Sequence, residues 1–127
     1  MLEKITNRYT TTYLYRNPKE RSWISAVEWF CSLVNTQTVK AEKVTLRDTQ
    51  HRNDEGNLSV EYLLPLDSAE IAEQISARGI DCITVSGLLG ETSLAISLDI
   101  KTLEVGIAMR NAVLLDEATL ETALHLE

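Results

Sequence analysis

Long apolar runs are missing from the 127-residue chain. A helix that crosses a bilayer needs about 18 or more consecutive apolar residues, and no such stretch occurs. Residues 1–8 also lack the apolar segment of a signal peptide. We therefore expect no membrane partner and a cytoplasmic location.

Cysteine and histidine are scarce, with two residues of each. Cys31 and Cys82 have apolar neighbours, one in a predicted helix and the other in a predicted strand, so we expect two reduced thiols that pack as small hydrophobic side chains. A metal site needs several convergent ligands, and neither His51 nor His125 lies near a cysteine in the sequence. The carboxylates that share a polar hairpin with His51 are Asp48, Asp54 and Glu55. We interpret them as turn residues, and we expect no metal and no cofactor.

Sequence motifs for catalysis are missing too. The glycine-bearing loop 86–90 follows a predicted strand, but neither a helix nor a lysine follows it to hold a phosphate group. No nucleophile elbow occurs, and carboxylate pairs are so common in an acidic chain that no single pair indicates a reaction. Spacing alone does not test whether a nucleophile meets its base only in the folded chain. On these grounds we expect a protein that is not an enzyme.

The net charge of −7 is distributed unevenly. Residues 1–64 have nine Lys or Arg and eight Asp or Glu, a net of +1, whereas residues 65–127 have three and eleven, a net of −8. A negative field repels phosphate backbones and speeds association with a basic partner. We therefore expect no nucleic-acid binding and consider a basic protein as the partner. The other interpretation is that the acids only keep the chain soluble.

Strand and helix patterns alternate in the first half of the chain. Residues 5–16 predict one strand, with one face formed by Ile5, Tyr9, Tyr13 and Tyr15. Asn17 followed by Pro18 predicts the N-cap of a helix over residues 18–36. The next strands are expected over residues 38–47 and 58–64, joined by the polar hairpin 48–57.

The second half begins with the clearest helix boundaries in the chain. Asp67 is a predicted N-cap with Glu70 as its capping-box partner, and Gly79 is the predicted end of the helix. A meander follows, with strands over residues 80–86, 92–100 and 103–109 and a turn at residues 87–90. A last helix is expected to begin at Asp116.

The apolar and charged fractions of 44% and 24% are close to globular averages, which predicts a single domain over residues 1–127. The expected element order is β-α-β-β-α-β followed by β-β-α. The first six elements match the order of a ferredoxin-like split βαβ unit. We therefore predict an α+β fold with an antiparallel sheet and with helices packed mainly on one face.

Trp29 is the residue that the helix prediction explains least. It lies off the apolar stripe, among serines, so it should be at least partly exposed. Exposed tryptophan is favoured at protein interfaces, but a flanking strand or loop could also cover it. The row formed by Tyr9, Tyr13 and Tyr15 also has two interpretations: it could be a recognition surface, or it could face the helices as part of the core.

A binding function agrees best with these patterns. The candidate partner-binding residues are Trp29, Asp99, Glu104, Asp116, Glu117 and Glu121. Our leading hypothesis is a non-enzymatic acidic domain that docks a basic protein, as small bacterial immunity proteins and antitoxins do when they block a nuclease toxin.

Two alternatives stay open. Gly106 and Ala108 are small residues on the face of the last predicted strand that is opposite its apolar face. A small ligand or an enzymatic pocket could lie against the sheet there. Alternatively, the chain could be a structural subunit that forms a homodimer through a strand edge or the Trp29 face. A deep pocket with convergent polar groups would favour the first alternative, and concentration-dependent association would favour the second.

Overall fold

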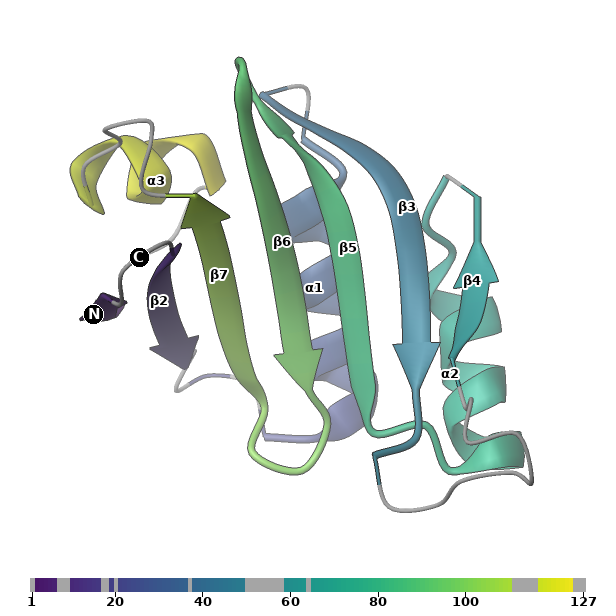
Figure 1. Ribbon diagram of the computed structural model, residues 1–127. Helices are drawn as coiled ribbons and strands as arrows, with labels where there is room; N and C mark the ends of the chain where they lie inside the picture. Colours follow the sequence, from purple (N-terminus) through teal and green to yellow (C-terminus); the bar gives the residue numbers. More distant parts are fainter. Residues whose placement is uncertain are drawn as a thin grey trace.

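The described part of the chain forms a seven-stranded antiparallel sheet and three helices (Figure 1). The strands are β1 (Leu2–Thr6), β2 (Thr10–Arg16), β3 (Val39–Arg47), β4 (Val60–Tyr62), β5 (Cys82–Leu89), β6 (Thr92–Asp99) and β7 (Glu104–Arg110). The helices are α1 (Trp23–Val34), α2 (Ser68–Arg78) and α3 (Glu117–Leu124). The predicted α+β class is confirmed.

The computed structural model describes residues 2–6, 10–16, 19, 21–36, 38–49, 59–63, 65–110 and 117–124. Within these ranges, no helix has both the length and the hydropathy that crossing a membrane requires.

The strands are arranged in the order β1-β2-β7-β6-β5-β3-β4, and every neighbouring pair is antiparallel. The meander β5-β6-β7 occupies the centre, where Val, Ile and Thr favour strands. The predicted ferredoxin-like order does not match this arrangement. The strand that precedes α1 pairs with β7 at the end of the meander, and the sheet has seven strands, whereas the predicted element order has six.

The N-terminal strand expected over residues 5–16 is a hairpin of two strands. In this hairpin Ile5 pairs with Thr12, and directly opposite residues of an antiparallel pair point to the same face. Tyr13 and Tyr15 lie on the other face and are only 2% and 4% exposed, whereas Ile5 is 55% exposed. The predicted common face is therefore wrong, because the chain reverses between Ile5 and the tyrosines. Tyr9 lies outside the described residues.

The hydrophobic core lies on one side of the sheet. On β5, Ile83 and Val85 are fully buried, whereas Thr84 and Ser86 point away from the core. The same alternation occurs on β6 and β7. Figure 1 shows α1 behind β5 and β6, and α2 behind β3 and β4. The buried side chains of α3 belong to the same cluster, at Leu120, Ala123 and Leu124. A fully buried Leu or Ile stabilises a fold by about 1.5–3 kcal/mol, so this helix side supplies most of the stability.

The helix boundaries are set by side-chain caps. The Ser22 hydroxyl accepts a hydrogen bond from the Ser25 backbone N–H at 3.2 Å, so α1 begins at Trp23. The predicted start at Asn17 and Pro18, which lie outside the described residues, is therefore wrong. The boundaries of α2 are as predicted. The N-cap is Asp67, whose carboxylate accepts hydrogen bonds from two backbone N–H groups, and the helix ends at Gly79 with a φ of 69°.

Gly87 lies inside β5, and this corrects the predicted turn at residues 87–90. The strand continues to Leu89, and the turn to β6 follows at Gly90 and Glu91. A Cβ atom on Gly87 would lie 2.6 Å from the Lys40 carbonyl oxygen. Because Gly87 has no side chain, β3 can approach β5 closely at this point. The register between the two strands shifts here, and Glu42 is the extra residue of a bulge in β3.

We expect Gly87→Ala to lower the free energy of unfolding by about 1–3 kcal/mol, because the new methyl group meets backbone atoms that only a shift of β3 can move. Urea denaturation measures this change.

Gly106→Ala is the matched control. Its Cβ atom would meet only side-chain atoms, Oγ of Ser97 at 3.2 Å and Cδ2 of Leu14 at 3.7 Å, which can rotate away. We expect a loss below about 1 kcal/mol, since small adjustments of side chains cost little. Equal losses in the two variants would contradict the close approach of β3 to Gly87.

Candidate functional site

The face of the sheet that the helices leave uncovered carries mainly short and polar side chains; we call it the open face. Register places these side chains in rows across the strands. One row is Thr12, Ala108, Ala95, Ser86 and Lys43, and the next is Leu14, Gly106, Ser97, Thr84 and Thr45. Strand spacing and length give this face an extent on the order of 30 Å by 20 Å. That is close to the roughly 800 Å² that one partner contributes to a standard protein interface.

A hollow of about 320 Å³ lies in the open face, and it opens to solvent. Its small and hydroxyl-bearing lining residues include Thr10, Ser86, Ser93, Ala95 and Ala108, and its charged ones are Glu42 and Arg110. Of the two small residues proposed from the sequence, Ala108 lines this hollow and Gly106 does not. The side chains of Ser97 and Leu14 fill the space beside Gly106.

A second, smaller hollow of about 30 Å³ lies where β4 meets the start of α2. We call its accessible rim the β4–α2 patch, formed by Tyr62, Leu63, Pro65, Asp67 and Glu70. Leu63 is 87% exposed, and the two acids are exposed beside it. An apolar centre with a polar rim is typical of protein interfaces.

The local sequence explains how this patch forms. Pro65 cannot donate a ladder hydrogen bond, and β4 ends at Tyr62. Asp67 then caps α2 by accepting hydrogen bonds from the N–H groups of Ala69 at 3.0 Å and Glu70 at 3.4 Å. The change from strand to helix within a few residues therefore holds two carboxylates next to an exposed leucine.

The sequence predicts a strand and a helix cap in this region, but it did not lead to the prediction that their residues form one surface. The alternation in residues 58–64 was nevertheless informative. Apolar residues recur there at every second position and include Tyr62, which packs partly against the core, so Leu63 points the other way. An apolar residue on the solvent face of a strand, followed within seven residues by two acids, is a pattern from which the patch could have been predicted.

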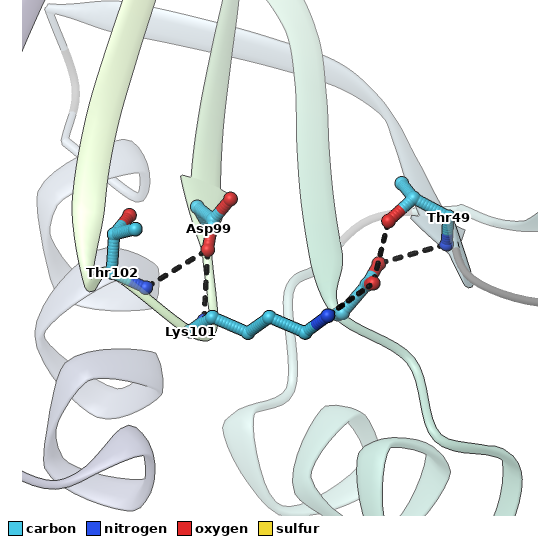
Figure 2. Close-up of polar contacts among 5 residues, drawn as sticks. Thr49, Asp99, Lys101 and Thr102 are labelled. Atoms are coloured by element: carbon cyan, nitrogen blue, oxygen red, sulfur yellow. Dashed lines mark hydrogen bonds and ion pairs between the residues drawn. The ribbon is translucent and has the colours of Figure 1, made fainter.

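The first pair of predicted acids lies around the turn from β6 to β7. The Asp99 carboxylate accepts hydrogen bonds from the backbone N–H groups of Lys101 at 2.8 Å and Thr102 at 2.9 Å, as Figure 2 shows. Glu104 lies directly opposite Arg16 of β2 in the register. Glu104 therefore has a basic residue opposite it, and Asp99 has a structural role in the turn.

The remaining predicted acids belong to the region of α3. Glu121 is half-buried on this helix, the side chain of Glu117 is not described, and Asp116 lies outside the described residues. Figure 1 shows α3 beside the C-terminal end of β7, whereas the β6–β7 turn lies at the other end of this strand. Since β7 is seven residues long, its two ends lie about 20 Å apart. The structure therefore does not gather the α3 acids with Asp99 and Glu104 on one surface.

Trp29 lies half-buried on α1 and packs against β2. The centroid of its ring is 5.9 Å from that of Tyr15, and the ring planes are tilted by 39°. Part of the tryptophan is thus covered by a neighbouring strand, which was one of the two interpretations of the sequence. Tyr13 and Tyr15 are buried in the core and do not form a recognition surface.

A buried carboxylate joins three segments at one end of the sheet. Asp81 is 8% exposed and accepts hydrogen bonds from the backbone N–H of Thr49 at 2.9 Å and from the Thr49 hydroxyl at 2.6 Å (Figure 2). Lys101 Nζ lies 4.0 Å from the same carboxylate. The backbone N–H of Asp81 donates a hydrogen bond to the carbonyl oxygen of Arg47, and the Asp81 carbonyl oxygen accepts one from the N–H of Ile100. Asp81 is therefore a structural acid that ties β3, β5 and the β6–β7 turn together.

Both cysteines are free thiols, as expected. Cys31 is buried on α1, and burial, followed by the negative charge of Asp67, raises its pKa to about 11. Cys82 is half-buried on β5, where burial raises its pKa although the side-chain hydrogen bond with Thr84 opposes the shift. A thiol with a raised pKa is a poor nucleophile, so the surroundings of these cysteines do not activate them.

Metal ligands do not converge in the part of the chain that the structure describes. No group of three or more His, Cys, Asp or Glu residues there could hold a metal ion. His51, Asp54 and Glu55 of the polar hairpin lie outside the described residues.

Comparisons of the chain with protein-family models, with curated proteins and with solved structures found no match in any of the three.

We expect Asp81→Asn to lower the free energy of unfolding by about 1–3 kcal/mol, because a neutral amide replaces a charged acceptor of two partly buried hydrogen bonds. Lys101→Met should change it by less than about 1 kcal/mol, since this lysine is largely exposed and 4.0 Å away. Urea denaturation of both variants measures the difference. Equal effects would show that the ion pair, and not the Thr49 contact, stabilises this end of the sheet.

The raised pKa of Cys31 predicts a loss of stability in alkali. A thiol with a higher pKa in the folded chain stabilises the fold fully below its ordinary pKa of 9.0, and this contribution disappears as the pH rises toward about 11. Between these values, the free energy of unfolding of the wild type should fall by about 1–3 kcal/mol more than that of Cys31→Ala. Parallel pH profiles for the two proteins would contradict the shift.

Proposed function

We propose that this chain is a non-enzymatic protein-binding domain that docks a basic protein through the β4–α2 patch, in the manner of an immunity protein or antitoxin that blocks a toxin. The observation that carries the proposal is Leu63, which is 87% exposed beside the carboxylates of Asp67 and Glu70. A contiguous apolar patch with a polar rim is typical of surfaces that another protein covers, and here Tyr62 and Pro65 lie with Leu63 in one such patch.

The charge around the patch favours a basic partner. The first two turns of α2 contain Glu70 and Glu73 beyond the Asp67 cap, and within the described residues none of these acids forms an ion pair with Lys or Arg. The one base of α2, Arg78, is in its last turn. At 1.5 Å per residue it lies about 12 Å from Glu70 along the helix.

The shape of the patch suits a long basic side chain. The methylene groups of a lysine or arginine can lie along an apolar surface while the charged end stays at its edge. Here the apolar surface is formed by Tyr62, Leu63 and Pro65, and the edge by Glu70. The small hollow beneath them leaves room for part of one side chain.

The other acids of the C-terminal half have a long-range role in this proposal. Asp99, Glu104, Asp116, Glu117 and Glu121 add to a negative field that steers a basic protein toward the molecule. Trp29 lies outside the β4–α2 patch, and its role in this proposal is the packing of α1 against β2.

The proposal predicts that the tagged chain captures a basic protein from cells, and that binding of this partner, once purified, depends on the patch. Glu70→Lys should slow association at low salt by about tenfold, and Leu63→Asp should mainly speed dissociation. Stopped-flow kinetics over a series of salt concentrations separates the two effects.

Glu91→Lys is the matched control, because it reverses the same charge at the exposed β5–β6 turn, away from β4 and α2. It should slow association much less than Glu70→Lys does. Equal effects of the two reversals would contradict docking at the patch. Capture of a second copy of this chain, in place of a basic protein, would contradict the proposal and favour self-association.

A further inference from the structure

The hollow in the open face contains two charged residues of opposite sign. Glu42 and Arg110 both line it and both are exposed. Within the described residues, neither carries an ion pair or a side-chain hydrogen bond. Two uncompensated charges at one hollow attract a ligand that carries both complementary charges.

The fold places these two charges from opposite sides. Glu42 is the extra residue of the β3 bulge, which the missing side chain of Gly87 permits. Arg110 is the last residue of β7 and lies opposite Thr10 of β2. Register therefore puts Arg110 level with Ser93 of β6, and the two charges face each other across β6 and β5.

The distance between these strands limits the size of the ligand. Three strand spacings of about 4.8 Å separate β7 from β3, or about 14 Å in all. Arg110 and Glu42 line the hollow from its two sides, so a ligand that bridges them has to span less than this distance. The volume of about 320 Å³ can hold a molecule of amino-acid size.

We propose that this hollow binds a small zwitterion, with its ammonium group on Glu42 and its carboxylate on Arg110. The guanidinium group of arginine can hold a carboxylate with two parallel hydrogen bonds. The hydroxyl groups of Ser86 and Ser93 supply further polar contacts, and the methyl groups of Ala95 and Ala108 contact the aliphatic part of the ligand.

Neighbouring charges agree with this assignment. Lys43, the residue of β3 that follows Glu42, forms an ion pair with Glu61 at 2.7 Å and is directed toward β4. Glu42 is therefore the charged residue of β3 that lines the hollow. This site lies on the open face, separate from the β4–α2 patch, and it does not depend on the protein partner.

The test is a ¹H–¹⁵N NMR titration with glycine, β-alanine and 4-aminobutanoate. At least one of these zwitterions should give saturable shifts at Ser86, Ser93, Ala95 and Ala108. Butylamine and butyrate, which carry one charge each, should bind at least about tenfold more weakly, because each lacks one charge-assisted contact.

Glu42→Gln and Arg110→Gln should each weaken zwitterion binding by about tenfold, whereas Glu3→Gln, on the edge strand β1, should leave it unchanged. The spectra away from the substituted residues report whether each variant keeps the fold. The proposal is overturned if no zwitterion gives saturable shifts at the lining residues, if the singly charged compounds bind equally well, or if both variants bind as the wild type does. Binding of the basic protein partner should be the same in Glu42→Gln and the wild type, which separates this site from the patch.

Discussion

One-sided burial of the sheet is the constraint on which the rest of this structure depends. Helices cover a single face, and the aliphatic side chains of β5, β6 and β7 point to that face at every second residue. Because the side-chain period of a strand is two, a shift of one residue in any strand would turn its apolar side chains to water. The core therefore fixes the register of the strands, and the register in turn determines which residues appear on the open face.

The places available for function are those that this core leaves uncovered. The open face has short side chains, so a hollow can form there wherever a longer side chain at its rim projects above the sheet, as Glu42 and Arg110 do. The sheet edge at β4 is different, because it combines an exposed leucine with the acids that begin α2. These surfaces differ in chemistry, and each therefore fits a different class of ligand.

Local rules predicted the elements whose signals are local. The boundaries of α2 followed from Asp67 and Gly79, because a cap needs only its own backbone. The N-terminal hairpin was missed because the tyrosines and Ile5 keep the same alternation on both sides of the reversal. The turn prediction for Gly87 is wrong because the role of this glycine depends on β3, a segment distant in the sequence. Composition predicts the number of acids but not their roles. The fold shows that the carboxylates of Asp81 and Asp99 accept hydrogen bonds, whereas within the described residues the Glu70 carboxylate does not.

The most direct test of this arrangement is thiol labelling at two adjacent residues of β5. Val85→Cys and Ser86→Cys, each in a background of Cys31→Ala and Cys82→Ser, place one thiol on the buried side and one on the open face. A small maleimide should modify the thiol at residue 86 about as fast as in the unfolded chain. The thiol at residue 85 should react orders of magnitude more slowly, since it is exposed only when the core opens. Equal rates at the two residues would contradict a sheet that is covered on one face and open on the other.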